Sequence, residues 1–279
     1  MLMSIVTPCK NRLAHLQQTL PLMRKVEFAE VIVVDYGCEQ GTGEWIAANY
    51  PDVRVIRVTD DPVFHVSRAR NIGGAHAVAD ALCFIDADTF VIGDLSDWAT
   101  RNLKKGWFFV IPDIGVSTAG FLLCQKADFL NVGGYDEALR GWAPEDMDLY
   151  ERLEISGVKK GHVPSAMFSS IDHGDELRQF GATVGAFQDR QKAFALGAFY
   201  RIVKRDLRKL TDKEPELEFR KQLFDQIKRL DQLAEQEGRP SFNLLVNLGP
   251  RDLRPTNCAC STSLEYRYER NPGPPPPDA

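Results

Sequence analysis

The sequence predicts an α/β protein with a mainly parallel β-sheet flanked by helices and a C-terminal helical extension. Up to about residue 170, short apolar runs of strand length alternate with segments of helical periodicity. Such a β-α-β succession favours a parallel sheet with helices on both faces. After residue 200 the pattern changes, and Lys or Arg alternate with Asp or Glu. That change is typical of a solvated helix with one docking face.

Six apolar runs are expected to form the strands. They are rich in Val, Ile, Leu and Phe, the composition that suits buried strands. In chain order they are MSIVTP (3–8), EVIVVD (30–35), VRVIRV (53–58), ALCFID (81–86), WFFVIP (107–112) and GFLLCQ (120–125).

Helices are expected between these runs. Leu13, Leu16 and Leu20 fall at helical spacing after the first run. Before the fourth run, Ser67 is expected to cap a helix through the alanine-rich segment SRARNIGGAHAVADA (67–81). The sheet and these helices constitute the first predicted domain, residues 1–200.

Two further segments are predicted after residue 200. Residues 201–240 read as a charged amphipathic helix, which either packs on the first domain or pairs with another chain. Residues 241–279 are expected to be an irregular, Pro-rich tail that ends in NPGPPPPDA. The apolar stripe of the helix consists of Leu223, Ile227, Leu230 and Ala234.

Composition excludes some classes of function. A net charge of −5 argues against nucleic-acid binding, which needs a basic surface. The first residues, MLMSIVTPCKNR, have no basic leader before an unbroken apolar run, so neither a signal peptide nor a membrane span is expected. Most cysteines lie singly in apolar or turn contexts, which suits a reducing compartment. We expect a cytoplasmic protein, with peripheral attachment at the inner membrane face left open.

Acidic residues end two of the predicted strands. Asp35 ends the second run and Asp86 the fourth, and ligands collect at the carboxyl ends of parallel strands. Asp88 follows two residues after Asp86, so along a strand both carboxylates share a face and can converge on one divalent cation. The alternative is a solvated turn, because Asp is a common turn residue.

The segment GWAPEDMDLYERL (141–153) carries a second acidic group. Pro144 suits a first helical turn, and Glu145 and Asp146 suit the positive end of a helix dipole. Capping alone explains these acids. Trp142, however, offers a flat apolar face of the kind that stacks on sugars, and acids beside it can hold or deprotonate a hydroxyl. The two interpretations are compatible.

Basic residues follow the first strand and begin the alanine-rich helix. Lys10 and Arg12 belong to the first group, and Arg68 and Arg70 to the second. At a helix N-terminus these side chains suit a diphosphate, and the alternative is surface solubility. His173, alone after a predicted strand, is either structural or a ligand.

Taken in order, these segments resemble the inverting GT-A glycosyltransferases, in particular the β-1,4-galactosyltransferases and related bacterial family-2-like enzymes. The resemblance covers about residues 1 to 180 and implies the Rossmann-like GT-A form of the sheet. The segments that carry it are TPCKNRLAHL (7–16), HVSRARNIGG (65–74), CFIDADTF (83–90), AGFLLCQKADFLNVGGYDEALRGWAPEDMDLYERL (119–153) and IDHGD (171–175).

The resemblance implies a donor site for a UDP-sugar. Pro8, Lys10 and Arg12 would line the nucleotide pocket. Asp35 would contact the uracil, and Arg68 would reach the nucleotide or its diphosphate.

It also implies a metal site for Mn²⁺ or Mg²⁺. Asp88 would bind the ion directly, with Asp86 supporting the ribose or the metal-bound water. His173 would complete the site. Ser170 stands where the family can offer a further ligand, and a serine there would bind weakly.

On the acceptor side, the resemblance implies that Trp142 stacks near the sugars, Glu145 holds the glycan acceptor, and Asp146 is the general base of one inverting displacement. The chain departs from the family at Ala143 and Pro144, which replace a flexible Gly-Gly. These replacements imply smaller or differently hinged loop movement.

A further departure concerns the donor. Ser117 stands where the galactosyltransferases carry a bulky tyrosine, so the pocket has room for an N-acetyl group. The expected enzyme is a metal-dependent hexosyltransferase of polysaccharide biosynthesis that moves a hexose or N-acetylhexosamine, with Gal and GalNAc favoured. UDP-GalNAc is expected to react at least as readily as UDP-Gal. A sugar-1-phosphate nucleotidyltransferase and a non-catalytic carbohydrate-binding protein on a GT-A fold are the alternatives.

Overall fold

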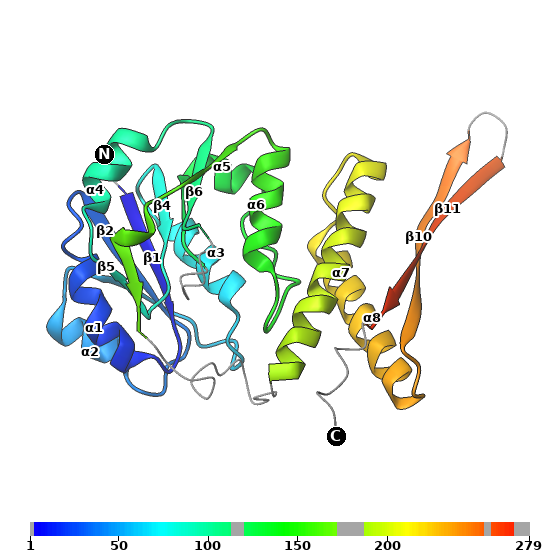
Figure 1. The fold of residues 1–279 in the computed structure, drawn as a ribbon, viewed down its shortest axis with the longest axis horizontal. Coiled ribbons are helices and arrows are strands. Elements are labelled where there is room, and N and C mark those ends of the chain that lie inside the picture. Colours follow the sequence, from blue (N-terminus) through cyan, green and yellow to red (C-terminus); the bar gives the residue numbers. More distant parts are fainter. Residues whose placement is uncertain (1–2, 113–119, 172–186, 254–257, 271–279) are drawn as a thin grey trace, which may run out of the picture. The chain divides into compact units, whose positions relative to one another are not determined.

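The computed structural model describes residues 3–112, 120–171, 187–253 and 258–270 (Figure 1). Contacts divide the chain into two compact units, Met1–Gln191 and Lys192–Ala279. The boundary therefore lies nine residues before the expected one at 200. Within the described ranges, no helix is long and apolar enough to cross a membrane.

The first unit is built on a seven-stranded sheet of described residues, in the order β3-β2-β1-β4-β7-β6-β8. Neighbouring strands are parallel except around β7, which pairs antiparallel with β4 and β6. The mainly parallel sheet is thus confirmed. The strands are β1 (Met3–Cys9), β2 (Ala29–Asp35), β3 (Arg54–Arg57), β4 (Ala81–Phe84), β6 (Trp107–Val110), β7 (Leu122–Gln125) and β8 (Lys159–His162).

The six predicted apolar runs all contain strands, whereas β8 was not predicted. Its sequence, KKGH, has no apolar residue, and it is mostly exposed at the edge of the sheet. Backbone pairing with β6 therefore forms this strand without an apolar signal.

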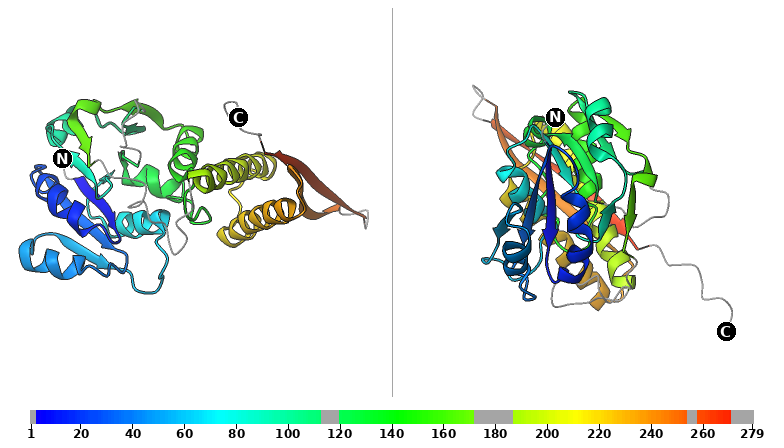
Figure 2. Two further views of the ribbon diagram at one scale, coloured as in Figure 1. Left: turned by 60° about the horizontal axis from the view of Figure 1, so that its bottom comes forward. Right: turned by 90° about the vertical axis from the view of Figure 1, so that its left-hand side faces the viewer.

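Helices flank the sheet (Figure 2). Because alternate strand residues face opposite sides, Ile5 of β1 belongs to one core cluster and Val6 to the other. The Ile5 cluster includes residues of α1 (Leu13–Met23), α2 (Thr42–Asn49) and α4 (Leu95–Asn102). The Val6 cluster includes residues of α3 (Val66–His76), α5 (Lys126–Asn131) and α6 (Glu145–Ile155).

The helix α3 differs from its prediction at both ends. Its N-cap residue is His65, so Ser67 lies inside the first turn, where it is fully buried and does not cap the helix. At the other end the chain leaves the helix at Ala77 to reach β4. Gly73 and Gly74 are buried on the inner side of α3, which lets the helix approach the sheet closely.

The two acids after β4 lie in a turn and not on a strand. The carbonyl of Asp86 accepts a hydrogen bond from Thr89 N at 3.0 Å, which closes the turn into β5 (Thr89–Val91). The expectation that Asp86 and Asp88 share a strand face is therefore wrong. After the short helix η1 (Ser165–Met167), β9 (Phe168–Ser170) pairs antiparallel with β5.

The second unit contains α7 (Phe187–Thr211) from Lys192 onward, α8 (Leu217–Gln236) and the antiparallel strands β10 (Ser241–Leu253) and β11 (Cys258–Glu269). Leu223, Ile227 and Ala234 of the predicted stripe are buried, and α8 packs on β10. The expected helical extension is thus two helices, covered within their own unit.

The expected irregular tail is wrong for residues 241–253 and 258–269, which form strands. The physical reason is a period-two pattern: Phe242, Leu244 and Val246 are buried while the residues between them are exposed. The Pro-rich residues 271–279 lie outside the described residues.

Gly73→Ala is expected to destabilise the protein. An added Cβ would lie less than 3.0 Å from Cγ1 of Val6, inside the core. We expect a loss of about 1–3 kcal/mol from overpacking, although Ala favours a helix over Gly by about 1 kcal/mol. Urea denaturation measures the difference. The control Ala75→Leu, on the exposed side of α3, should change stability by less than about 0.5 kcal/mol. Unchanged or higher stability of Gly73→Ala would contradict this packing.

Candidate active site

A buried arginine joins three of the expected site acids. Arg70 of α3 has a side chain that is only 2% exposed. Its Nη2 donates to Oδ1 of Asp86 at 2.9 Å, and its Nη1 donates to Oδ1 of Asp146 at 2.9 Å and to Oε1 of Glu145 at 3.3 Å. The acids come from the turn after β4 and from the first turn of α6. The structure therefore gathers Asp86, Glu145 and Asp146 around one guanidinium group.

The sequence grouped Arg70 with Arg68 as a side chain suited to a diphosphate and did not predict that Arg70 contacts the site acids, although a signal for this exists. Positions 67, 70, 73 and 74 share the buried side of α3, at the spacing that defines one helix face. Arg68 lies two residues before Arg70 and hence on another side of the helix. On a helical wheel the two arginines fall on different sides of α3, and Arg70 falls on the side that faces the protein interior.

Burial and mutual repulsion perturb two of these acids. Loss of hydration, with added repulsion from Asp146, raises the pKa of Glu145 to about 8 against the attraction of Arg70. Loss of hydration also raises the pKa of Asp86 to about 6, and repulsion from Asp88 adds to the shift. The carboxyl group of Glu145 is therefore mostly protonated at neutral pH.

Asp86 and Asp88 lie close together beside Arg70. Asp86 retains 32% exposure of its side chain, and Asp88 is close enough to repel it. Gly120, at φ +101°, lies directly over the group: a Cβ there would come within 2.5 Å of Asp86 Oδ2 and Arg70 Nη2. Carboxyl groups outnumber the guanidinium group here, and hard cations prefer carboxylate oxygen. The described residues nevertheless contain no set of three His, Cys, Asp or Glu arranged to hold a metal ion.

The predicted third metal ligand, His173, lies outside the described residues, as does Ser117. The chain that leads to residue 173 is nevertheless described. Ser170 pairs with Thr89, and Ile171 N donates to the carbonyl of Asp88 at 2.8 Å. The backbone therefore passes beside Asp88 just before position 173.

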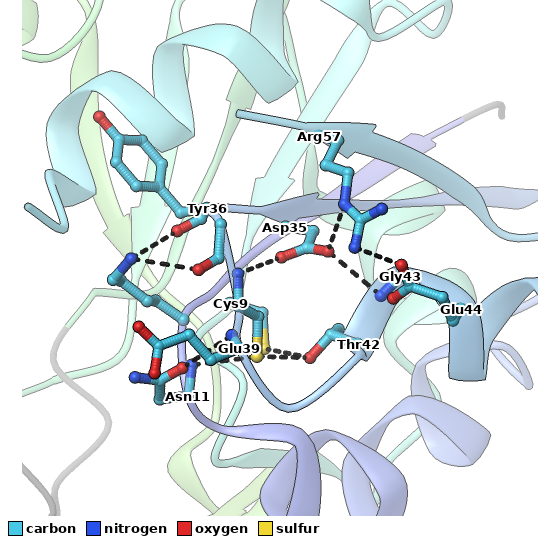
Figure 3. Close-up of polar contacts among 12 residues, drawn as sticks. Cys9, Asn11, Asp35, Tyr36, Glu39, Thr42, Gly43, Glu44 and Arg57 are labelled. Atoms are coloured by element: carbon cyan, nitrogen blue, oxygen red, sulfur yellow. Dashed lines mark hydrogen bonds and ion pairs between the residues drawn. The ribbon is translucent and has the colours of Figure 1, made fainter. Parts of the chain in front are cut away.

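Asp35 organises the loop after β2 (Figure 3). Its carboxylate accepts hydrogen bonds from Cys38 N at 2.8 Å and Gly43 N at 3.2 Å, and Arg57 Nε lies 3.4 Å away. The side chain is fully buried. In this structure Asp35 therefore shapes the loop, and its contact with uracil stays a prediction.

The remaining predicted residues of the nucleotide pocket surround the same loop. Lys10 Nζ donates to the carbonyls of Tyr36 at 3.0 Å and Gly37 at 3.2 Å, which ties the loop to the end of β1. Pro8 is buried in β1, and Arg12 is the N-cap residue of α1. These three residues thus lie at the carboxyl end of β1, where the sequence placed them.

A thiol pair in this loop was not predicted as part of the site. Thr42 Oγ1 donates to Cys38 Sγ at 2.9 Å and lies 3.8 Å from Cys9 Sγ. Hydrogen bonds from Cys9 and Thr42 lower the pKa of Cys38 to about 5, against the opposing effect of burial. Cys38 is therefore a buried thiolate that helps to fix the loop.

Arg68 belongs to a separate network. Its Nη2 lies 2.6 Å from Asp60 Oδ2, and its Nη1 lies 3.7 Å from Asp61 Oδ2 and 3.4 Å from the hydroxyl of Tyr36. Arg140 pairs with Asp61 as well. Its contact with Tyr36 places Arg68 beside the loop after β2, and its contact with a nucleotide stays a prediction.

The predicted acceptor side is the loop before α6. Pro144 is the N-cap residue of α6, and Glu145 and Asp146 occupy its first turn as predicted. Trp142 is half-buried, and the guanidinium group of Arg190 lies 5.5 Å from the centre of its ring. The indole ring is therefore already used as a stacking surface.

Two family models match parts of the first unit. Residues 4–133 match the family model described as "Glycosyl transferase family 2", and residues 113–174 match the one described as "N-terminal domain of galactosyltransferase". Beta-1,4-galactosyltransferase 1 of Homo sapiens is 24% identical over 165 residues, which cover 56% of this chain and 37% of that protein. Validoxylamine A glucosyltransferase of Streptomyces hygroscopicus subsp. jinggangensis is 26% identical over 220 residues, 56% of this chain and 52% of that protein. The chain thus matches about half or less of these relatives.

Solved structures show the same fold. TarS 1–349 of S. aureus, in complex with UDP-GlcNAc, aligns with a TM-score of 0.56 at 13% identity, covering 85% of this chain and 75% of that one. The mannosyltransferase PcManGT of Pyrobaculum calidifontis, in complex with GDP-Man and Mn²⁺, aligns with a TM-score of 0.53 at 12% identity, covering 83% and 75%. These matches confirm the GT-A architecture of the sheet and its flanking helices.

Glu145→Gln is expected to gain stability relative to the wild type as pH rises. In the unfolded chain Glu145 loses its proton near 4.5, and in the folded protein near 8. Between these values the folded state holds a proton that the unfolded state has released, so Glu145 lowers the stability of the wild type with rising pH. Glutamine does not titrate. The folded pKa already includes the attraction of Arg70, so we expect the advantage of the variant to grow by about 3 kcal/mol between pH 5 and pH 8.

Urea denaturation at both pH values measures this difference. Glu154→Gln changes the exposed end of the same helix and is the matched control, for which no such growth is expected. An advantage of Glu145→Gln that stays constant with pH would contradict the buried, proton-bearing state of Glu145.

Proposed function

We propose that this chain, which has the GT-A fold, is a glycosyltransferase that moves a hexose or N-acetylhexosamine from a UDP-sugar to a hydroxyl of a glycan acceptor. Gal and GalNAc are the favoured donors. The reaction is a single displacement with inversion, and the bound ion is Mn²⁺ or Mg²⁺.

The bonds made by Arg70 carry this proposal. One side chain contacts Asp86, beside the proposed metal and donor diphosphate, and Asp146, the proposed base. A displacement needs the donor and the base within reach of the same reacting carbon. The span of one guanidinium group satisfies that need, because both acids lie within hydrogen-bond distance of it.

The two acids of α6 take different roles. Glu145, with its raised pKa, carries a proton at neutral pH and donates a hydrogen bond to the acceptor glycan. Asp146 uses Oδ1 to accept from Arg70, which orients its second oxygen toward the attacking hydroxyl. It accepts the hydroxyl proton as the acceptor oxygen attacks the anomeric carbon. Trp142 supplies a stacking face for the sugars when the side chain of Arg190 moves off its ring.

The metal ion would be held by Asp88 and His173, with Asp86 supporting it. A divalent ion between the phosphates stabilises the negative charge that develops on the departing UDP. Mixed carboxylate and imidazole ligands suit Mn²⁺, and the PcManGT complex contains Mn²⁺ on the same fold.

The proposed donor pocket consists of the loop after β2 with the basic residues around it. Lys10 and Asp35 hold the loop, and Arg12 and Arg68 add positive charge for the nucleotide. The small side chain of Ser117 supports an N-acetylhexosamine donor. The TarS complex contains UDP-GlcNAc, which is a precedent for such a donor on this fold.

A panel of UDP-sugars tests the proposal directly. We expect UDP release with UDP-GalNAc at least as fast as with UDP-Gal, dependence on added Mn²⁺, and loss of activity in EDTA that Mn²⁺ restores. Turnover of UDP-Gal alone would contradict the role of Ser117. Pyrophosphate release from UTP and a sugar 1-phosphate would indicate a nucleotidyltransferase, and binding of glycans without any UDP release would indicate a carbohydrate-binding protein.

Substitution of each α6 acid tests the assignment of the base. Asp146→Asn should lower kcat by about 10²- to 10⁴-fold, the usual contribution of a general base, with little change in donor KM. Glu145→Gln keeps a hydrogen-bond donor and should lose at most about tenfold in kcat/KM for the acceptor. Glu154→Gln is the control on the same helix. A larger loss for Glu145→Gln than for Asp146→Asn would exchange the two roles.

A further inference from the structure

The hairpin of the second unit ends in strands with open outer edges. Within the described residues, β10 and β11 pair only with each other. The outer edge of each strand presents backbone N–H and C=O groups that a further strand can pair with. Proteins usually protect such edges against pairing, so an unprotected edge indicates where a further strand can add.

The register of the hairpin identifies the outward groups of β11. Arg270 N donates to the carbonyl of Pro240 at 2.8 Å, and Ser241 lies opposite Glu269. Because hydrogen-bonded and non-hydrogen-bonded pairs alternate in an antiparallel ladder, the even-numbered residues of this region bond within the hairpin. The N–H and C=O groups that face outward belong to Ser263, Glu265, Arg267 and Glu269.

The two edges differ in protection. On β10 the register shifts between Asn247 and Pro250, and proline has no N–H to donate. A bulge and a proline are two of the usual devices that block edge pairing. Before that shift, residues 241–247 pair regularly with residues 263–269, and neither stretch contains proline. The exposed residues of β10 there are uncharged, whereas those of β11 include Glu265, Arg267 and Glu269, so β11 is the edge that offers charges for pairing.

The exposed face of β11 carries alternating charge. Glu265, Arg267 and Glu269 are exposed, and the side chains of Arg267 and Glu269 are 66% and 64% exposed. Between them, Tyr266 and Tyr268 contact Phe199 of α7 with ring centres 6.3 Å and 5.4 Å apart. One face is thus committed to the helices, and the other offers charges to a partner strand.

We propose that β11 pairs antiparallel with β11 of a second copy of this chain, about a two-fold axis at Tyr266. In that register Glu265 lies opposite the partner's Arg267 and Arg267 lies opposite the partner's Glu265. Both residues belong to the set whose backbone groups face outward, so the ion pairs coincide with hydrogen-bonded positions. The two hairpins form one four-stranded sheet, with an isologous interface.

Charge selects this register over its neighbour. An axis at Arg267 would place Arg267 opposite its own copy and Glu265 opposite the partner's Glu269, and like charges directly opposite are destabilising. An axis at Tyr268 restores opposite charges for Arg267 and Glu269 but pairs fewer strand residues. The sequence therefore favours self-pairing at Tyr266, and the self-association expected of residues 201–240 is assigned instead to β11.

Analytical ultracentrifugation of the full chain, over a concentration series, tests this interface with charge-swapped variants. The wild type should show a monomer–dimer equilibrium. Arg267→Glu places two Glu pairs opposite each other and should raise the dimer Kd by about tenfold or more. The double variant Glu265→Arg with Arg267→Glu restores opposite charges across the axis and should recover a Kd near that of the wild type.

Arg229→Glu, which makes the same change of charge on the exposed side of α8, is the control and should leave the Kd unchanged. Circular dichroism of each variant confirms that it is folded. A wild type that stays monomeric at all concentrations would overturn the proposal. So would a dimer that Arg267→Glu does not weaken, or one that the double variant fails to restore.

Discussion

The contacts of Arg70 with three carboxyl groups are the constraint on which the site depends. A buried charge is stable only when it is paired, and removing one member of such a group leaves the others uncompensated. Arg70 reaches its partners because Gly73 and Gly74 let α3 lie close to the sheet. The same guanidinium group then fixes the turn after β4 and the first turn of α6 relative to each other.

The excess of carboxyl groups around Asp86 favours binding of a cation, which transfer from a nucleotide sugar requires in the proposed mechanism. Carboxyl groups crowd around Asp86 and Asp88, so a cation at the site relieves repulsion that the fold itself creates. On the other side of Arg70, the same crowding leaves Glu145 with a proton. One electrostatic arrangement thus prepares both the proposed metal side and the proposed acceptor side.

Much of the sheet could be predicted from the sequence, because each of the six apolar runs contains a strand, and all of these except β3 are mostly buried. The unpredicted strands have other origins. β8 has no apolar residue, and the pattern of β10 was obscured by the Pro-rich residues that follow it. The acids of the site could be predicted from strand ends and from family resemblance. The inward direction of Arg70 depends on which side of α3 meets the sheet, and the burial of Asp35 depends on how its loop closes, so neither follows from residue type alone.

A double-mutant cycle between Arg70 and Asp146 tests this account most directly. The free energy of unfolding is measured for the wild type, Arg70→Met, Asp146→Asn and the double variant. If Arg70 gathers the site acids, losing Asp146 costs stability while Arg70 is present and relieves repulsion once it is absent. The account therefore predicts a coupling energy of at least about 1 kcal/mol. A coupling energy near zero would show that the two side chains do not act on each other, and would contradict the account.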